Sequence, residues 1–572
     1  MRRSAVALSV LVALAVLTGC SGSNTGAAAV PTQPGEPGSG VTGVRAPSDV
    51  PGGTLRVVAG QIDSLDPQRS YATGVWNLMR LYARTLVTYS AEPGSTDELV
   101  PDLATDLGTT PDGGRTWTFT LREDVRFETG RSITSRDVKY GIERSFASEV
   151  VVGGPTYVVD LLDDEADPYP GPYQDETADR LGLRSIATPD DRTIVFTLTT
   201  PTPDFPFVMA LPSSSPVPAE KDTGGAYGDD PISSGPYMIT SVDAQAGIAF
   251  ERNPQWDPAT DDVRTALPDA VLVRTGLSGV ARDQALLAGS ADLDISGTGV
   301  QQATTSRLAD DALAGRIDDV TTGAIRLLAM PTTVVPMDDR DCRAAVAAVV
   351  DRGAVQEALQ GPGNAERTSV LWPRALAGGP VESDPQPDVD AARAALAACG
   401  RPDGFSTVLA VPDVATSVLV AQALATDLAE VGIVAEVRPL DPSTYYSDIS
   451  NPDVVTAAGY GLVLATWTAD FPTAASFLVP LVDGRSIRGL GNTNYARLDD
   501  PGVNGLVDVA RAATDPAASA DAWRQVADAV QQTAAYVPLA ETRVQLLAGQ
   551  RLRNGVVMQL YGSYDVATAG VG

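Results

Sequence analysis

Carboxylates and cysteines are the main side chains of this 572-residue sequence that could do chemistry, because the chain contains no histidine. Ser-His-Asp and Cys-His catalysis both need an imidazole base, and imidazole is the commonest ligand of zinc, nickel and haem iron. A Ser-Lys mechanism has little support, since neither Lys139 nor Lys221 lies three residues after a serine. We therefore predict that the chain is not an enzyme and that it binds no metal or cofactor.

Adjacent acidic residues are the remaining catalytic candidates, because a hydrolase needs two carboxylates or a metal. The pairs are Asp163-Asp164, Asp310-Asp311 and Asp499-Asp500. Neighbouring side chains of an extended chain point apart, so we interpret these pairs as solvated loops. A surface hydrolase stays an alternative that turnover assays would test.

The N-terminus indicates export. Arg2 and Arg3 precede an uncharged run over 5–17, which is the pattern of a secretory signal and is too short to span a bilayer comfortably. The run ends in Leu17-Thr18-Gly19-Cys20, which resembles the cleavage box of bacterial lipoproteins. We expect a signal peptide over 1–19, lipidation of Cys20 and a location on the extracytoplasmic face of the cell membrane. An ordinary signal peptide with a chance cysteine is the alternative.

The segment after this cysteine is expected to be a tether. Residues 20–50 are rich in Gly, Ser, Pro and Thr and contain few large apolar side chains, so they cannot bury enough surface to offset their ordering entropy. The two other cysteines, Cys342 and Cys399, lie in a chain bound for an oxidising compartment. We favour a disulfide between two neighbouring helices, with two separate buried thiols as the alternative.

Composition and charge describe the rest of the chain. The formal net charge is −31, which repels phosphate backbones and argues against nucleic acid as a partner. With 44% hydrophobic residues and no second long apolar run, the chain should form a soluble body of several domains. The lipid anchor would be its one attachment to the membrane, and we expect a monomer.

Hydrophobic periodicity predicts an α/β fold. Residues 407–411, a helical stretch through Leu424 and Leu428, and residues 433–438 form a βαβ unit, so this half should contain a parallel or mixed sheet. Residues 461–467 should be a further, central strand. Other expected strands are 53–58, 117–121, 193–198, 237–242, 247–252, 270–274 and 291–296, and other expected helices are 74–87, 135–146, 282–289 and 519–533.

Short motifs are spread along nearly the whole mature chain. They include Ser64-Leu65-Asp66-Pro67, Glu98-Leu99-Val100-Pro101-Asp102, Ser234-Gly235-Pro236-Tyr237, Glu251-Arg252-Asn253-Pro254, Val350-Asp351-Arg352 and Val537-Pro538-Leu539. In their order and spacing, these motifs resemble one family, the large periplasmic-type solute-binding proteins that serve peptide and nickel ABC importers.

The resemblance implies a bilobed periplasmic-binding-protein fold of the large, three-subdomain class. The chain would build the first lobe, form an inserted subdomain, cross to the second lobe and return at its C-terminus. The expected limits are 51–88, 232–320 and 537–572 for the first lobe, 89–231 for the inserted subdomain and 321–536 for the second lobe. A ligand would be engulfed between the lobes as they close about a hinge.

The resemblance also implies a ligand site. Ala465-Thr466-Trp467-Thr468-Ala469-Asp470 resembles the cleft strand of peptide-binding members, whose aspartate pairs with the α-ammonium of the ligand. A carboxylate about 4 Å from an ammonium gains roughly 4 kcal/mol at an effective dielectric constant near 20. A turn or N-cap role is the alternative for Asp470, and core packing is the alternative for Trp467. The full set of expected ligand-binding residues is Asp470, Trp467, Thr466, Thr468, Tyr71, Thr73, Tyr237 and Glu541.

The predicted function is therefore an extracytoplasmic lipoprotein that binds short peptides and delivers them to the permease subunits of an ABC importer. Backbone pairing with the ligand main chain would tolerate many side chains. The alternatives are the same receptor for a metal chelate, haem, an oligosaccharide or a peptide-like natural product, and a signalling lipoprotein without transport. The missing histidines argue against direct ligation of nickel or haem.

Overall fold

The computed structural model describes residues 38–572 except 165, 244, 377, 381–382 and 490. The predicted signal peptide and Cys20 lie outside the described residues. The predicted tether is too long at its C-terminal end, because residues 39–42 form helix α1 (Ser39–Thr42) and Arg45 is buried. The Arg45 guanidinium forms a 2.8 Å ion pair with buried Asp318, and this pairing orders a segment whose composition predicts disorder.

The first lobe is built on a five-stranded sheet in the order β10-β1-β9-β8-β7. β1 pairs in parallel with both β9 and β10, and β8 pairs antiparallel with β7 and β9. The bounds are β1 Thr54–Val58, β7 Tyr237–Asp243, β8 Gly247–Arg252, β9 Ala270–Arg274 and β10 Leu293–Asp294. These strands confirm the predicted positions, although the last is shorter than the predicted 291–296. Helix α6 (Gly279–Leu287), which precedes β10, confirms the predicted helix over 282–289.

Helix α2 (Thr73–Met79) is shorter than the predicted helix over 74–87. The chain turns after Met79 because two arginines enter buried ion pairs. Arg80 bonds Asp565 at 2.9 Å and Arg84 bonds Asp102 at 2.7 Å. Tertiary pairing of charges therefore ends the helix earlier than its apolar spacing indicates.

The inserted segment contains a three-stranded sheet in the order β4-β6-β5 with helices beside it. Helix α3 begins at Ser135 as predicted, and its cap is Thr134, whose backbone N–H and hydroxyl both donate to the Asp137 carboxylate at 2.8 Å. The Ser135 hydroxyl donates to the Asp190 carbonyl. The bounds are β2 Val87–Tyr89, β3 Leu99–Pro101, β4 Thr116–Thr120, α3 Ser135–Arg144, α4 Tyr157–Leu162, β5 Ile186–Ala187, β6 Thr193–Thr197 and α5 Phe205–Val208.

The second lobe contains a six-stranded mixed sheet in the order β12-β16-β11-β15-β13-β14. The predicted βαβ unit is confirmed, because β13 (Ser406–Pro412) and β14 (Val434–Leu440) pair in parallel on either side of α12 (Ala415–Ala429) in the sequence. The apolar strand β15 (Tyr460–Trp467) lies between β11 and β13, as predicted. The remaining bounds are α9 Arg340–Val349, α10 Arg352–Ala358, β12 Ala365–Arg367, α11 Val389–Ala398, α13 Tyr445–Ile449, α14 Pro452–Ala458, α15 Ala474–Val482, α16 Pro501–Ala512 and α17 Pro516–Thr533.

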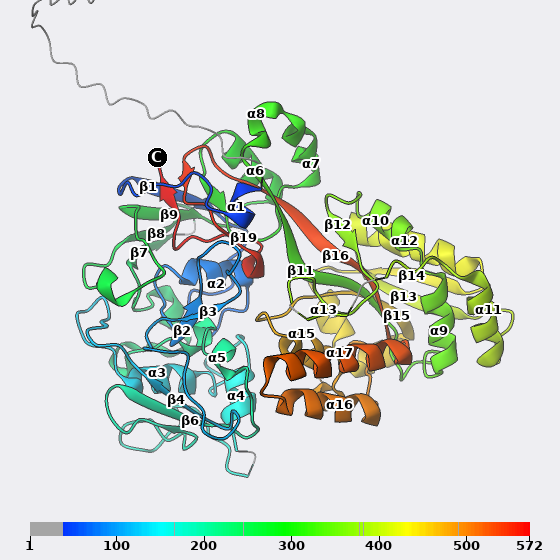
Figure 1. Cartoon of the computed structure of the whole chain (residues 1–572), viewed down its shortest axis with the longest axis horizontal. Helices are drawn as coiled ribbons and strands as arrows, with labels where there is room; N and C mark the ends of the chain where they lie inside the picture. The colour runs from blue at the N-terminus through cyan, green and yellow to red at the C-terminus, as the bar shows by residue number, and fades with distance from the viewer. Residues whose placement is uncertain (1–37, 165, 244, 377, 381–382, 490) are drawn as a thin grey trace, which may run out of the picture. The chain divides into compact units, whose positions relative to one another are not determined.

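Two long antiparallel strands, β11 (Ile317–Ala329) and β16 (Tyr536–Leu547), link the lobes and run side by side between them (Figure 1). Their first-lobe end pairs Ile317 with Leu547, and their second-lobe end pairs Ala329 with Tyr536. The register breaks between Thr321 and Ile325. A bulge of this kind bends a strand locally, so the pairing of the two crossing strands is irregular at this point.

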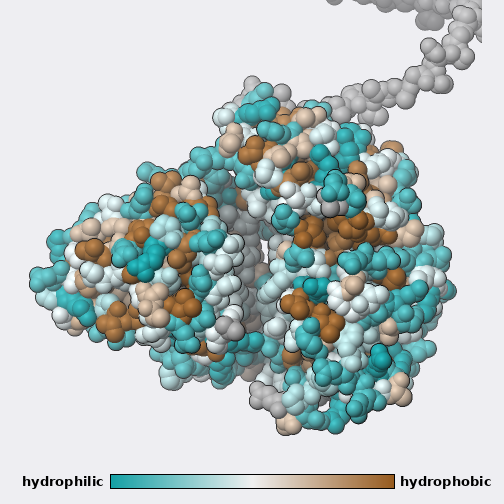
Figure 2. Space-filling view, turned by 180° about the vertical axis from the view of Figure 1, so that it is seen from behind, coloured by the Kyte–Doolittle hydropathy of each residue, from teal (hydrophilic) through white to brown (hydrophobic). Residues whose placement is uncertain are grey.

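Each lobe has its own core. The largest apolar cluster joins the first-lobe sheet to the inserted segment, and two further clusters cover the six-stranded sheet. Leu327 and Leu328 belong to different clusters of that sheet, which places these clusters on its opposite faces. Seen from behind, the surface carries small apolar groups among polar ones, and a furrow runs between the two lobes (Figure 2). Among the described residues, no helix combines the length and the apolarity needed to cross a bilayer.

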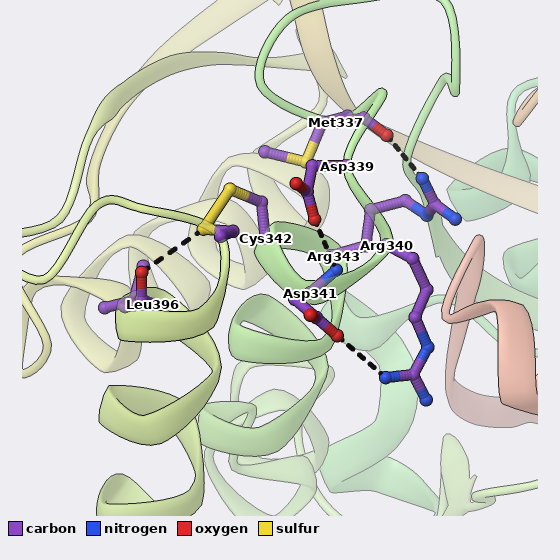
Figure 3. The surroundings of a disulfide bond; sticks show 8 residues. Met337, Asp339, Arg340, Asp341, Cys342, Arg343 and Leu396 are labelled. Atoms are coloured by element: carbon purple, nitrogen blue, oxygen red, sulfur yellow. Dashed lines mark hydrogen bonds and ion pairs between the residues drawn. A yellow bond between two sulfur atoms is a disulfide. The ribbon is translucent and has the colours of Figure 1, made fainter.

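A disulfide between Cys342 and Cys399 joins two helices of the second lobe, as predicted, with 5.4 Å between the Cα atoms. Cys342 lies on α9 and is fully buried, and Cys399 is the C-cap of α11 (Figure 3). The next residue, Arg343, donates to the Met337 carbonyl and fixes the start of α9 against the preceding loop (Figure 3). The disulfide therefore closes a loop of the chain that contains α10 and β12.

Candidate functional site

Asp470 lies in the turn that leads from the central strand β15 to helix α15. The Ser476 hydroxyl accepts hydrogen bonds from the backbone N–H groups of Asp470 and Phe471, at 3.1 and 3.2 Å. Thr473 is the N-cap of α15, and its hydroxyl accepts from the backbone of Ser476. The turn is thus closed by serine and threonine hydroxyls, and the Asp470 carboxylate takes no part in capping the helix.

The Asp470 carboxylate instead joins three parts of the chain. Its Oδ2 accepts a 2.7 Å hydrogen bond from the Tyr71 hydroxyl and a 2.5 Å hydrogen bond from the Tyr157 hydroxyl. Tyr71 precedes α2 of the first lobe, and Tyr157 is the first residue of α4 in the inserted segment.

Local contacts hold both tyrosines toward the carboxylate. The Tyr71 backbone N–H donates to Asp63 at 2.6 Å, and its ring stacks on buried Trp76 with 5.7 Å between ring centroids. The Tyr157 ring packs edge-on against Phe471, at 5.2 Å. Tyr71 still exposes 51% of its surface, so the first-lobe side of the junction faces solvent.

Among the described residues, the Asp470 carboxylate has no positively charged partner. The residue is partly buried, and among the described residues no arginine or lysine lies within ion-pairing distance of it. Burial raises the pKa of Asp470, and the hydrogen bonds from Tyr157 and Tyr71 partly oppose this rise. Burial and the nearby Asp470 charge raise the pKa of both tyrosine hydroxyls, which keeps them as donors.

Several other predicted residues lie within a few positions of Tyr71 or Asp470 in the chain. Thr73 begins α2, two residues after Tyr71. Thr466 and Trp467 end β15, and the partly exposed Thr468 follows them. The Thr466 N–H donates to the Tyr446 hydroxyl at 3.2 Å, so this backbone group is already paired. The Trp467 ring nitrogen donates to the Phe477 carbonyl at 2.9 Å, and its ring packs on the core of the second lobe.

Two predicted ligand residues are placed elsewhere, and their assignment is corrected. Tyr237 is 1% exposed in the core of the first lobe, where its hydroxyl donates to the Pro268 carbonyl at 2.7 Å. Glu541 is fully buried on β16, opposite Ile325 at the register break of the crossing strands. It accepts from the Arg374 backbone, and burial raises its pKa to about 7. Both residues act within the scaffold, because neither side chain has surface to offer to a ligand.

Sequence reasoning missed two residues beside this site, namely Tyr157, which bonds Asp470, and Tyr446, which bonds the Thr466 backbone. Tyr157 bonds Asp470 although 313 residues separate the two in the sequence, and no local sequence pattern indicates such a contact. Tyr446 follows the buried Tyr445 on α13, and this tyrosine pair gave no periodic signal that distinguished the two.

Comparison with known proteins identifies the family. The sequence model described as "Bacterial extracellular solute-binding proteins, family 5 Middle" matches residues 98–488. The chain belongs to this family. Family-5 solute-binding proteins serve ABC importers, and their fold is the bilobed one predicted from the sequence, with several α/β sheets.

Individual relatives agree with this membership. This solute-binding protein is 24% identical to the peptide transport periplasmic protein SapA of Salmonella typhimurium, over 98% of the chain and 97% of the relative. The solved structure of the clavulanic acid biosynthesis oligopeptide binding protein 2 is 42% identical, with a TM-score of 0.91, and the match covers 95% of this chain and 100% of that one. The Helicobacter pylori periplasmic binding protein DppA, solved with the peptide STSA, is 19% identical with a TM-score of 0.68, covers 90% of this chain and 98% of its own, and shares the fold.

Proposed function

We propose that this family member captures short peptides between its lobes, with the α-ammonium of the ligand bound to Asp470. One observation carries the proposal. Asp470 is a partly buried carboxylate without a basic partner among the described residues, and it meets both the first lobe and the inserted segment. Burying a lone carboxylate is costly, and a ligand cation at this position would offset that cost.

The ligand main chain would lie along the segments that flank the carboxylate, residues 466–468 and 71–73. A peptide that bonds through its backbone can vary its side chains, which suits a receptor of broad specificity. Trp467 would offer apolar surface to one side chain of the ligand. Closure of the lobes about the crossing strands β11 and β16 would bury the ligand and supply the contacts that favour the closed state.

The receptor would work at the extracytoplasmic face of the membrane, anchored through lipid on Cys20 by way of residues preceding the folded body. One acyl chain anchors a protein only weakly, so a stable anchor needs a second chain. The partners would be the ligand and the permease subunits of an importer, and the protein would act without catalysis. These proposals rest on the N-terminal sequence and on family membership.

The test measures capture of a pool of tripeptides by protein purified from exporting cells, read by native mass spectrometry. We expect the pool with free amines to bind at least about tenfold better than the same pool after N-acetylation, because only the free amine carries the charge that Asp470 needs. Asp470→Asn should remove that preference. Equal capture of both pools by wild type and variant, with unchanged melting temperature, would contradict the assignment.

Asp175→Asn is the matched control, because this carboxylate also accepts a hydrogen bond from a tyrosine, Tyr169, at 2.9 Å. It lies in the inserted segment and, among the described residues, forms no hydrogen bond with Tyr71 or Tyr157. Its replacement should leave the preference for free amines intact. If this control lost its preference for free amines as fully as Asp470→Asn does, the loss would indicate general damage to the folded protein.

A peptide-like natural product is the second candidate ligand, and one observation favours it. The 42% identical solved relative is named as an oligopeptide binding protein of clavulanic acid biosynthesis. A natural product with a free amine would use Asp470 in the same way as a peptide. Native mass spectrometry of protein from its own host would separate the two candidates by the mass of the bound ligand.

A further inference from the structure

We infer that a strap formed by residues 38–49 holds the first-lobe end of the crossing strand β11, and that Arg45 acts through Asp318 to position this strand for closure on a ligand. This inference rests on the proposed function, to which it adds a positioning residue. The strap is the first segment of the described chain. It contains helix α1 and ends before β1.

The Asp318 carboxylate is the point where the strap meets β11. Asp318 is the second residue of this strand and is fully buried. The Arg45 guanidinium donates to both of its oxygens, at 2.9 and 2.8 Å. The Gly40 backbone N–H donates to Oδ1 at 3.0 Å, and the Tyr564 hydroxyl donates to Oδ2 at 2.5 Å. The strap therefore supplies three of the four hydrogen bonds that these residues donate to the carboxylate.

Hydrogen bonds also hold the strap to the C-terminal segment of the chain. The backbones of Arg45 and Gly555 exchange two of them, at 2.9 and 3.0 Å. The Asn554 side chain accepts from the Ser48 N–H and donates to the Ser48 carbonyl, both at 2.7 Å. Within the strap, Gly40 and Arg45 are the only buried residues. Polar contacts with little apolar burial are typical of segments that open locally at low free-energy cost, so we expect the strap to be released as a unit.

The position of Asp318 links the strap to the connection between the lobes. The crossing strands β11 and β16 begin their pairing in the first lobe at Ile317 and Leu547. The Gly38 N–H donates to the Ile317 carbonyl at 3.1 Å. The strap thus bonds the first two residues of the strand that leads into the second lobe.

Release of the strap should loosen this end of β11. The Asp318 carboxylate would lose the Arg45 charge, and a buried carboxylate without its cation is costly. The first residues of β11 would then pair less firmly with β16, and the open lobes would sample more relative orientations. Closure on a ligand would remove that added freedom, so it would cost more conformational entropy. Ligand affinity should therefore fall when the strap is released.

Gly40 allows a test that leaves every charge in place. A Cβ atom at this position would lie 2.6 Å from Oδ2 of Asp318 and 3.1 Å from the Tyr564 ring, so Gly40→Ala should push the strap away from β11. Gly363→Ala is the matched control, because a Cβ atom there would meet nothing within 4 Å beyond its chain neighbours. Both variants add one methyl group, and only the first adds it against Asp318.

Arg45 variants test the charge itself. Arg45→Gln removes the ion pair with Asp318, whereas Arg45→Lys keeps the positive charge without the planar donors and should retain part of the ligand affinity. Arg56→Gln is the control for the loss of an ion pair to a buried carboxylate in the same lobe, because Arg56 on β1 bonds Asp292 at 2.9 Å. It should leave ligand affinity near that of wild type.

The measurements are hydrogen exchange and tripeptide capture, both read by mass spectrometry on the purified full chain. We expect Gly40→Ala to speed exchange in residues 38–49 and 317–321 and to weaken capture of the free-amine tripeptide pool at least about fivefold. Coupling acts in both directions, so saturating wild type with this pool should slow exchange in the strap. A strap with a merely structural role would show no such protection, because none of its residues forms a hydrogen bond with Asp470 or Tyr71.

Exchange in the strap that is the same with and without bound tripeptide overturns the coupling, even if no variant folds. Unchanged capture by Gly40→Ala, with faster exchange in both segments, overturns it as well. A loss of capture in Arg56→Gln as large as that in Arg45→Gln would assign the effect to general destabilisation. Failure of every tripeptide pool to bind wild type rejects the proposed function. In that case equal exchange of residues 317–321 in wild type and Gly40→Ala would separately show that the strap does not hold β11.

Discussion

The hydroxyl of Tyr71 donates a 2.7 Å hydrogen bond to the carboxylate of Asp470, although 399 residues separate the two in the sequence. The two residues come from different lobes, and the bond places the strongest candidate anion of the second lobe against the first. Tyr157 adds a third part of the chain to the same oxygen. The candidate site is therefore assembled by tertiary structure around one carboxylate.

Removing the Tyr157 hydroxyl should make ligand binding more sensitive to acid. Its hydrogen bond lowers the pKa of Asp470 against the effect of burial, so Tyr157→Phe raises that pKa further. A protonated Asp470 cannot pair with an ammonium group. On acidification, the variant should lose tripeptide affinity at a higher pH than wild type, as measured by titrations between about pH 4 and 8.

Tyr169→Phe is the control for this experiment, because that hydroxyl bonds Asp175 in the inserted segment. It should leave the acid limb of the binding curve where it is in wild type. Superimposable acid limbs for wild type and Tyr157→Phe would show that Asp470 does not carry the charge that the ligand needs.

Much of the fold was predictable because its strands and helices are locally encoded. The β13-α12-β14 unit follows from apolar residues at helical spacing between two β-branched runs, and it occurs where predicted. Local pattern failed where distant charges decide the structure. The helix before Arg80 ends early because Arg80 pairs with Asp565, and Arg45 orders the supposed tether by pairing with Asp318.

The candidate site was predictable only in part, for a similar reason. Asp470 could be proposed because residues 465–470 resemble the cleft strand of peptide-binding family members. Tyr157 could not be found, since nothing near it in the sequence indicates that α4 meets the second lobe. Tyr237 was misassigned because a Gly-Pro turn beside an aromatic residue is as typical of a ligand-binding loop as of the start of a strand. Its ring is buried, so Tyr237 belongs to the core.

Glu541 should make the folded protein less stable as the pH rises through neutrality. Burial on the crossing strand raises its pKa to about 7, from 4.5 in an exposed chain. The folded state therefore gains stability from the protonated form below about pH 4.5 and loses it as the pH rises through about 7. The shift corresponds to about 3 kcal/mol.

Urea unfolding at several pH values measures this contribution. Glu541→Gln should flatten the fall in unfolding free energy between about pH 5 and 8, because the amide cannot ionise. The exposed Glu123→Gln controls for the loss of one negative charge. A slope as steep in Glu541→Gln as in wild type would assign the pH dependence to other groups.

Breaking the bond between Cys342 and Cys399 should lower the stability of the second lobe. The bond closes a loop with a sequence separation of 57 residues, for which the chain-entropy relation gives about 4 kcal/mol. The double variant Cys342→Ser with Cys399→Ser should unfold at lower urea concentration, and tripeptide affinity should change little because both cysteines lie away from Asp470. Thiol labelling of unfolded wild type without reductant should find neither residue free, and labelling of both would contradict the bond.

Two contacts between the second lobe and the inserted segment should contribute very different amounts to tripeptide affinity. Phe471 is 4% exposed and packs against Tyr157 and Phe207, with ring centroids 5.2 and 5.9 Å apart. Arg488 forms a 3.2 Å ion pair with Asp160, and both side chains are about half exposed. A buried aromatic cluster contributes several times more than an exposed ion pair, whose value is about 0–1 kcal/mol.

We therefore expect Phe471→Ala to reduce tripeptide affinity by more than about tenfold and Arg488→Ala to reduce it by less than about fivefold. The smaller effect should disappear in about 1 M salt, because salt screens exposed charges, while the effect of Phe471→Ala should persist. Phe471→Leu keeps apolar volume without the aromatic edge contact, and it should fall between wild type and alanine. Since Phe471 also belongs to the core, each affinity is read beside a urea unfolding curve. A larger loss for Arg488→Ala than for Phe471→Ala would mean that charge, rather than packing of the aromatic rings, holds the lobes around the ligand.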